Sequence, residues 1–286
     1  MTKLQAGLIC LMTFNSILLV GCGNMVGAMV QGWIAGGIAP SSFTVVNPSP
    51  RELPAGVAQL RALPETGEFD AIMLGVKPQK LAEVAPDVER FAGPGSVLLS
   101  VLAGVQLETL AGNFPRCAAQ VRVMPNLAAA LGKSPVALVG SGLDDSARAR
   151  VDALMGPLGT AEWLAEESLM DLVTALAGSG PAFVYRFIDA LAQGAAHLGL
   201  PAEQAQRLAL AMVEGASALA ASSEHSPGEL ARRVASPGGV TQVGLDVLDK
   251  DNALAVLVEA TLRGARDRSI EMAAQARAQA QAAAQR

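Results

Sequence analysis

The stretch Ser16-Ile17-Leu18-Leu19-Val20-Gly21-Cys22-Gly23-Asn24-Met25 decides the fold of this chain. Its first five residues are apolar apart from Ser16, and they predict a buried strand. The two glycines predict a tight turn, because glycine adopts backbone conformations that other residues avoid. A helical pattern follows from about Met25 to Ala35 and stops at Gly36-Gly37. Strand, glycine turn and helix in this order form the context that a dinucleotide-binding site requires.

The first half of the chain continues this alternation of short apolar runs and helical patterns. Continuous apolar runs are typical of strands that are covered on both faces of a sheet. Their alternation with helices predicts an N-terminal Rossmann-like α/β domain with a doubly wound parallel sheet. The expected strands are 16–20, 43–47, 71–76, 97–101, 121–124 and 136–139, with a further helix at 79–91.

The second half of the chain is predicted to be helical, because strand signals end after about Glu162. Apolar residues form one stripe along a helix that starts at Pro181, and the pattern repeats in a helix that starts at Pro201. Asn252 is expected to cap a long final helix. The low-complexity tract 273–286 is expected to be a frayed or solvated tail. We therefore expect a Rossmann-like domain at 1–163 and an all-α domain at 164–286.

The composition limits the classes of function. The chain has 286 residues, of which 51% are hydrophobic and 16% charged, and this favours two folded domains over disorder. The net charge is −5 and there is no long basic run, so we expect no nucleic-acid partner. Cys10, Cys22 and Cys117 fit no zinc pattern, so we expect no metal and a reduced, cytoplasmic setting.

The N-terminal apolar segment 8–20 has some features of a signal-peptide core. Asn15 and Ser16 interrupt it, however, and it runs directly into the first glycine turn, so we interpret 16–20 as a buried strand. Met12 is an alternative start, which makes residues 1–11 a candidate upstream extension. No other segment is apolar and long enough to span a bilayer, so we expect no membrane association.

The glycine turn has the residues that a dinucleotide phosphate needs. Gly21 allows the tight turn, Gly23 lets a pyrophosphate approach the backbone, and Asn24 and Met25 begin the helix whose N-terminus binds the anion. The usual third glycine is replaced by Val26. The alternative is an ordinary glycine turn after a strand. The context of strand, turn and helix favours the cofactor.

The end of the second expected strand indicates which dinucleotide binds. NAD sites usually place Asp or Glu there, whereas this chain has Asn47-Pro48-Ser49-Pro50-Arg51. No carboxylate repels a 2′-phosphate, Ser49 can donate a hydrogen bond and Arg51 supplies a positive charge. We therefore expect NADPH, with NADH as the alternative cofactor. The alternative for the loop itself is a proline-rich turn with one surface arginine.

The third expected strand ends in Val76-Lys77-Pro78. Ligands of open α/β sheets bind beyond the carboxyl ends of the strands, so Lys77 is placed to contact the cofactor ribose or the substrate. A lysine at a strand end is, taken alone, more often solvated.

A second anion site is predicted by Ser236-Pro237-Gly238-Gly239-Val240-Thr241, which a helical pattern follows. The glycines let backbone N–H groups turn toward one point, and a helix start adds unpaired N–H groups and the positive end of its dipole. Helix capping by Ser236 or Thr241 is the alternative. Capping explains one hydroxyl, but it leaves the two glycines and the second hydroxyl unexplained.

These motifs together resemble those of the pyrroline-5-carboxylate reductase family. The resemblance extends from about residue 17 to residue 274, and the order and spacing of the motifs make chance agreement improbable. The matching segments are Gly21-Cys22-Gly23-Asn24-Met25, Val76-Lys77-Pro78, Ser100-Val101-Leu102-Ala103-Gly104-Val105, Val123-Met124-Pro125-Asn126, Gly178-Ser179-Gly180-Pro181-Ala182 and Ser236-Pro237-Gly238-Gly239-Val240-Thr241, the last continued by Gly244-Leu245 and Leu248-Asp249.

The resemblance implies a reaction and an assembly. The reaction is the NAD(P)H-dependent reduction of the cyclic imine 1-pyrroline-5-carboxylate to L-proline, the last step of proline biosynthesis. The assembly is a homodimer, often within a decamer, that forms through the helical domain.

The resemblance also implies roles for residues. Ser236, Gly238, Gly239, Val240 and Thr241 correspond to the loop that holds the substrate carboxylate. Thr241, with Ser236 beside it, is placed for catalysis because the threonine hydroxyl contacts the ring nitrogen. Ser49 corresponds to the serine that contacts the 2′-phosphate. Val26 and Leu127 depart from the commoner family residues.

Two other readings of the sequence stay open. Another NADP-linked imine or hydroxyacid reductase has a similar two-domain build, but the hydroxyacid enzymes are expected to carry a lysine where 172–181 has none. A non-catalytic nucleotide-binding protein is expected to lose the anion loop, which is intact here.

Overall fold

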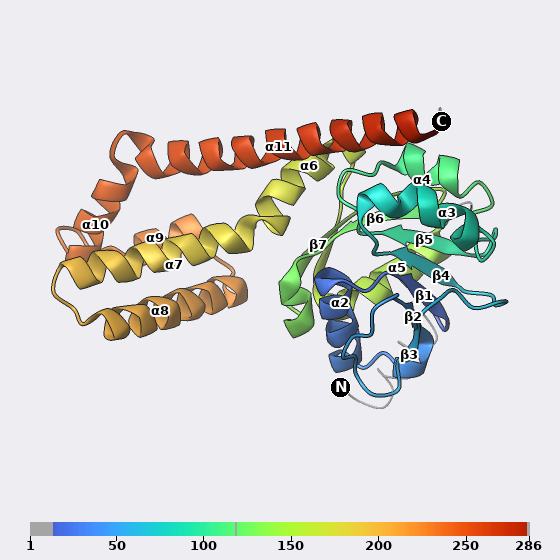
Figure 1. The fold of residues 1–286 in the computed structure, drawn as a ribbon. Coiled ribbons are helices and arrows are strands. Elements are labelled where there is room, and N and C mark those ends of the chain that lie inside the picture. The colour runs from blue at the N-terminus through green and yellow to red at the C-terminus, as the bar shows by residue number, and fades with distance from the viewer. Residues whose placement is uncertain (1–13, 118, 285–286) are drawn as a thin grey trace. The chain divides into compact units, whose positions relative to one another are not determined.

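The computed structural model describes residues 14–117 and 119–284, so the candidate upstream extension 1–11 lies outside the described residues. Contacts divide the chain into two units (Figure 1). The first unit reaches to Gly178 and also takes in the chain from Ala265 onward, and the second unit is Ser179–Gly264. The first contains all the described strands: β1 (Ile17–Val20), β2 (Phe43–Val46), β3 (Ala58–Leu60), β4 (Ala71–Leu74), β5 (Val97–Ser100), β6 (Ala119–Met124), β7 (Ser134–Ser141) and β8 (Gly159–Trp163).

The strands form one eight-stranded sheet in the order β3-β2-β1-β4-β5-β6-β7-β8. Neighbouring strands from β3 to β6 are parallel, which confirms the doubly wound Rossmann-like fold that the sequence predicts. At one edge, β7 runs antiparallel to β6, and β8 runs parallel to β7. The connection 125–133 between β6 and β7 is too short for a parallel crossover, and this explains the reversal.

Both faces of the sheet are buried, as the continuous apolar runs predict. Successive residues of β1 alternate between two cores: Ile17 and Leu19 belong to one, and Leu18 and Val20 to the other. Helices α2 (Asn24–Ala35) and α5 (Asp145–Met155) cover the first face, and α3 (Leu81–Glu89) and α4 (Leu107–Asn113) cover the second. The strand ends, where ligands of this fold bind, are therefore held between two buried cores.

Val26, which replaces the usual third glycine, is accommodated by a glycine on the facing strand end. The Val26 side chain is 1% exposed, and a Cβ built on Gly75 would lie 2.4 Å from its Cγ2 atom. The close approach of α2 to the sheet is thus kept, because Gly75 provides the space that Val26 fills. The other departure, Leu127, lies 60% exposed at the start of a short 3₁₀ segment, η3 (Leu127–Leu131).

The second unit is helical, as the sequence predicts. It is entered through α6 (Met170–Val173) and a π-helical turn, η6 (Thr174–Gly178), both of which belong to the first unit. Its helices are α7 (Gly180–His197), α8 (Ala202–Ser222), α9 (Pro227–Val234), α10 (Val240–Asp249) and the first part of α11 (Ala253–Ala284). Its buried core consists of only three small residues, Ala192, Ala205 and Ala209.

The tract 273–286, expected to be a frayed or solvated tail, is helical over the part of it that the structure describes, so fraying is wrong, although most of its described side chains after Ala273 are exposed. Helix α11 continues to Ala284, and Ala273 is only 5% exposed. A Cβ built on Gly104 would lie 3.0 Å from the Ala273 Cα atom, so the two backbones approach closely. Arg277 donates a 2.7 Å hydrogen bond to Gln106 Oε1. Alanine favours helix and its small side chain permits this close packing, so the low complexity of the tract does not indicate a frayed tail.

The start of α11 also differs in detail from the expected cap. The helix begins at Ala253, directly after Asn252, but Asn252 has φ +55°. An ordinary N-cap residue has extended backbone, so Asn252 serves here as a turn residue in the left-handed region, which asparagine tolerates.

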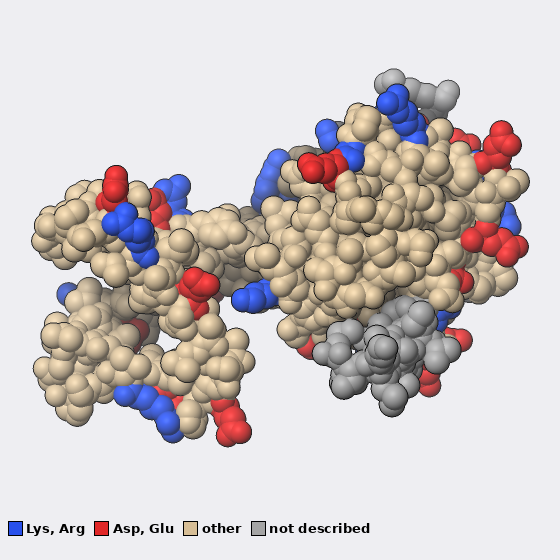
Figure 2. Space-filling model, turned by 90° about the horizontal axis from the view of Figure 1, so that it is seen from below, with Lys and Arg blue, Asp and Glu red and all other residues tan. Residues whose placement is uncertain are grey.

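Surface charge is dispersed rather than concentrated. Figure 2 shows acidic and basic side chains interspersed on the face in view. Over the residues that the structure describes, none of the helices has both the length and the apolar character needed to cross a bilayer.

Candidate cofactor and substrate sites

A cavity of about 530 Å³ lies beyond the carboxyl ends of β1, β2 and β4. Strand β1 lies between β2 and β4, at the point where the strand order reverses, which is the usual ligand position in open α/β sheets. The cavity brings together five of the predicted cofactor residues, namely Gly21, Gly23, Asn47, Val76 and Lys77. Residues far apart in sequence therefore meet at one cleft, as predicted.

The glycine turn has a different requirement at each of its glycines. Gly21 has φ +86°, and a Cβ there would lie 2.7 Å from the Val76 backbone nitrogen. Gly23 has ordinary backbone (φ −77°), and a Cβ there would have no neighbour within 4 Å. Gly23 precedes α2, whose first turn has no acidic residue and no side-chain cap. The first N–H groups of α2 have no partner within the helix, and the space beside Gly23 is open, so they can receive a phosphate.

This difference gives a matched pair of predictions. We expect Gly21→Ala to destabilise the fold by about 2–4 kcal/mol, because the new methyl group collides with backbone and left-handed φ is strained in alanine. We expect Gly23→Ala to change stability by less than about 0.5 kcal/mol, yet to weaken NADPH binding, because its methyl group occupies the space that the pyrophosphate needs. Thermal unfolding and calorimetric titration with NADPH measure the two effects. A stable Gly21→Ala protein would contradict the first, and unchanged NADPH affinity in Gly23→Ala the second.

The loop after β2 is tied to the glycine turn by side chains. Asn47 Oδ1 accepts a 3.2 Å hydrogen bond from Cys22 N–H, and Asn47 Nδ2 donates to Ser49 O at 2.5 Å. The Arg51 guanidinium donates to Cys22 O and to Asn24 Oδ1, each at 3.0 Å. A carboxylate at position 47 has no N–H to donate to Ser49 O. Asparagine thus has a structural role here, in addition to leaving the site without a negative charge.

The remaining predicted cofactor residues lie around the cleft without lining it. Ser49 is exposed in the loop after β2. Pro78 starts the 3₁₀ segment η2 (Pro78–Lys80), and the partly buried Met25 packs against the core. The cleft is also lined by three charged residues that the sequence did not predict: Lys80, Glu83 and Asp87. They come from η2 and α3, where a helical pattern gives no signal for a ligand.

The cysteine in the glycine turn is a packing residue rather than a nucleophile. Burial raises the pKa of the Cys22 thiol, and the nearby Arg51 charge offsets this only in part. Burial likewise raises the pKa of Cys117. Both thiols are free. Because their pKa values are raised, they stay protonated near neutral pH and are poorly reactive.

The predicted substrate loop folds as a glycine turn that ends in a helix start. Gly239 N–H donates a 2.9 Å hydrogen bond to Ser236 O, and Gly238 has φ +70°. Between the two residues that this bond joins lie a proline and a glycine with positive φ, which is the pattern of a type II turn. A Cβ on Gly239 would lie 2.5 Å from Ser236 Oγ and 3.0 Å from Ser236 O, so a larger residue at this position would displace the Ser236 hydroxyl.

The helix start after this turn is open. Gly239 is the N-cap of α10, with extended backbone and no side-chain cap. The first N–H bonded within the helix is that of Val243, to Gly239 O. The N–H groups of Val240, Thr241 and Gln242 therefore have no partner in the helix. The alternative of simple capping by Ser236 or Thr241 is not what the structure shows, and the turn has the donors of an anion site.

The fold and the cleft define this chain as a Rossmann-type dinucleotide-binding protein with a second, helical unit. Comparison with family models gives two matches. Residues 16–104 match the model described as NADP oxidoreductase coenzyme F420-dependent, and residues 167–272 match that described as pyrroline-5-carboxylate reductase dimerisation.

Relatives agree over nearly the whole chain. Pyrroline-5-carboxylate reductase 2 of Bacillus subtilis is 36% identical over 80% of this chain and 85% of its own length, and the Pseudomonas aeruginosa enzyme is 31% identical over 92% and 99%. The solved structure of the Coxiella burnetii reductase superposes with a TM-score of 0.82 and 29% identity, covering 91% of this chain and 98% of that one. The Plasmodium falciparum structure, which has NADP bound, has the same fold, with a TM-score of 0.75, 23% identity and coverage of 90% and 98%. This chain belongs to the pyrroline-5-carboxylate reductase family.

Proposed function

We propose that this chain is an oxidoreductase that reduces 1-pyrroline-5-carboxylate to L-proline with NADPH, the last step of proline biosynthesis. The observation that carries the proposal is the open helix start at Ser236–Thr241, an anion site in a chain that also has a dinucleotide cleft. Membership of the family supports the reaction, and the two sites supply its two requirements. One site holds the cofactor, and the other holds a small acid.

The cofactor is held by groups on the first unit. The N–H groups at the start of α2 face the pyrophosphate across Gly23, and Arg51 and Ser49 face the 2′-phosphate. The absence of a carboxylate in the sequence 47–51 supports NADPH over NADH. Bound NADPH supplies the hydride. The residues of the cleft fix the position of the cofactor from which that hydride is transferred.

The substrate is held by groups on the second unit. The N–H groups of Val240 and Thr241, together with the Ser236 hydroxyl, bind the carboxylate beside the positive end of the α10 dipole. Each such hydrogen bond to a charged group contributes about 1.5–3 kcal/mol. The Thr241 hydroxyl lies next to these groups and hydrogen-bonds the ring nitrogen.

The chemistry needs placement more than acid or base catalysis. A protonated cyclic imine is already electrophilic, so adding hydride to its carbon breaks the C=N π bond and leaves the electron pair on nitrogen, giving the amine. Reaction requires the two reacting carbons to be about 3–3.5 Å apart and aligned. Fixing the carboxylate on backbone N–H donors orients the ring for this approach, because a bidentate anion site defines direction as well as position.

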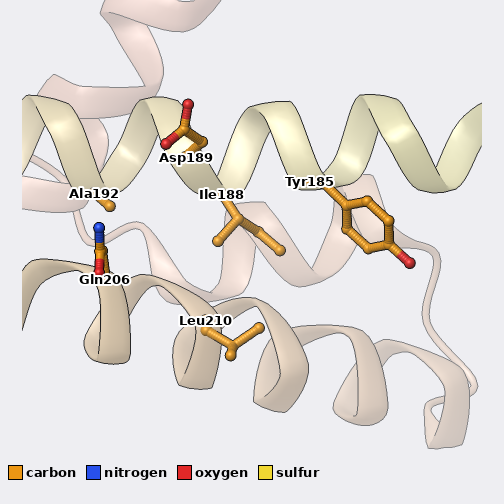
Figure 3. A pocket seen from close by; sticks show the side chains of 6 residues that line it. All are labelled: Tyr185, Ile188, Asp189, Ala192, Gln206 and Leu210. Carbon is orange, nitrogen blue, oxygen red and sulfur yellow. The ribbon is translucent and has the colours of Figure 1, made fainter. Parts of the chain in front are cut away.

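The helical unit supports assembly from identical chains. Large apolar side chains lie exposed along it, while its own core is three alanines. The exposed residues include Tyr185, Phe187, Leu208, Leu219, Val243, Val247 and Leu257. Figure 3 shows an open apolar groove between α7 and α8, in which Ile188 and Leu210 face each other. Exposed apolar patches are normally covered by a partner. We propose a homodimer through this helical unit, within a decamer, in the cytoplasm.

We therefore expect the chain to be at least dimeric in light scattering at micromolar concentration. Replacing the exposed Phe187 by Asp places a charge on the apolar face of α7, and we expect it to shift the protein toward monomer because an uncompensated charge opposes burial. Gln193→Glu, at an exposed polar position of the same helix, adds one negative charge and is the control. A monomeric wild-type protein would contradict the proposed assembly.

The function is tested by following NADPH oxidation with 1-pyrroline-5-carboxylate, beside other cyclic imines and 2-ketoacids at equal concentration. We expect the five-membered imine acid to be the preferred substrate. Preference for a ketoacid would favour a hydroxyacid reductase instead. Cofactor binding without turnover on any of these compounds would favour a non-catalytic nucleotide-binding protein.

A further inference from the structure

The amide of Gln59 forms a two-point contact with the backbone of a single residue in the cofactor loop. Arg51 N–H donates to Gln59 Oε1 at 3.0 Å, and Gln59 Nε2 donates to Arg51 O at 2.9 Å. Gln59 is half-buried on β3, a strand of three residues. Its side chain thus pairs with Arg51 as a neighbouring strand would, donating one bond and accepting the other.

The side chain of Arg51 is fixed at its other end. Its guanidinium donates to Cys22 O and Asn24 Oδ1 in the glycine turn. Arginine has more N–H donors than these two bonds use, so donors remain for a ligand. An exposed arginine otherwise loses much rotamer freedom when it binds an anion. Here its main chain and its tip are both held beforehand.

The loop between these contacts has its own restraint. Asn47 holds Ser49 O through its Nδ2 atom, so Asn47 and Gln59 fix the two ends of the segment 48–51. Pro48 and Pro50 restrict the backbone between them, because proline fixes φ. No carboxylate takes part in any of these bonds. The segment is therefore built to present Ser49 and Arg51 in one arrangement.

We propose that Gln59 is a positioning residue for selection of a dinucleotide that carries a 2′-phosphate. It acts through Arg51: by holding the Arg51 main chain, it keeps the free N–H groups of the guanidinium directed at the phosphate. The proposal rests on the proposed NADPH site. Gln59 acts on the loop that faces the 2′-phosphate and has no proposed contact with the nicotinamide or the substrate. Its effect therefore falls on cofactor selection and not on hydride transfer.

The test is calorimetric titration of the full chain with NADPH and with NADH, which needs no turnover. We expect Gln59→Leu to raise the Kd for NADPH about tenfold and to leave the Kd for NADH within about twofold. The guanidinium can keep its two bonds to the glycine turn in this variant, and the direction of its remaining N–H groups matters only for the 2′-phosphate. Gln59→Asn, whose shorter amide cannot reach both backbone groups, is expected to act in the same way. Leu60→Ala is the control, since it alters the same strand without touching Arg51.

A double-mutant cycle distinguishes positioning from general weakening of β3. In an Arg51→Ala background, Gln59→Leu is expected to change the NADPH Kd by less than about twofold, because the residue through which it acts is gone. An equal loss of affinity for both cofactors, an equal effect in the Arg51→Ala background, or the same result from Leu60→Ala would overturn the proposal. A wild-type chain that binds NADPH selectively but does not reduce the imine would refute the proposed reaction and leave this result intact.

Discussion

Thr241→Ala is expected to lower kcat for 1-pyrroline-5-carboxylate about 10- to 100-fold while leaving the Kd for NADPH unchanged. Thr241 is half-buried in the first turn of α10, next to N–H groups that have no partner in the helix. Its hydroxyl is proposed to contact the ring nitrogen, and a hydrogen bond to a charged group contributes about 1.5–3 kcal/mol. Loss of that amount in the transition state gives the stated decrease in rate. Steady-state kinetics and NADPH titration measure the two quantities.

Thr241→Ser is the matched control. It keeps the hydroxyl and removes only the methyl group, so we expect it to retain most of the turnover. The N–H groups of the turn are present in both variants, so carboxylate binding and KM should change less than kcat. If Thr241→Ala turned over the imine at the wild-type rate, Thr241 would have no part in the chemistry, and the role of the loop would be limited to binding the carboxylate.

The parts of the fold that sequence predicts well are those with a local signal. Mostly apolar runs identify β1, β2, β4, β5, β6 and β7, because a strand buried on both faces has few polar residues to interrupt it, although β6 also contains the buried Gln120 and Arg122. Strands β3 and β8 are missed for the converse reason. Residues of β3 are mostly exposed, and β8 alternates between partly buried and exposed positions, so neither has an apolar run.

Relations between distant segments were harder to predict. The antiparallel pairing of β7 follows from a short connection, and this constraint appears only when the strand ends are known. The packing of Ala273 against Gly104 joins residues far apart in the sequence. The composition of the tract 273–286 alone predicts that Ala273 is exposed to solvent. The fit of Val26 against Gly75 is a further pairwise relation of this kind, visible once the two backbones are in place.

The residues of the candidate site also divide into those with a local signal in the sequence and those without one. Gly21, Gly23 and Asn47 are predictable because a turn or a strand end demands particular residue types, and the structure brings them to one cleft. Gln59 has no such signal, because a single glutamine on a short exposed strand has no periodic or positional meaning in sequence. Its role follows only from the two bonds that it makes with Arg51.

Asn47→Asp is expected to lower the preference for NADPH over NADH about 100-fold. The carboxylate can still accept the Cys22 N–H bond, but it loses the donor to Ser49 O and places a negative charge at the end of β2. Like charges brought together at an interface cost several kcal/mol, so the 2′-phosphate of NADPH is disfavoured. The ribose 2′-hydroxyl of NADH can instead donate to the new carboxylate. The ratio of kcat/KM for the two cofactors measures the change.

Asn47→Ala separates the charge from the lost bonds. It removes both hydrogen bonds of the side chain without adding a charge, so we expect it to weaken the binding of both cofactors, NADPH somewhat more than NADH, and to lower the preference for NADPH far less than Asn47→Asp does. The charge effect should also diminish as ionic strength rises, since screening acts on the partly exposed position 47, whereas the effect of Asn47→Ala should not. If Asn47→Asp left the cofactor preference unchanged, the end of β2 would not face the 2′ position. The assignment of Ser49 and Arg51 to the phosphate would then fall with it, because Asn47 fixes the loop on which both residues lie.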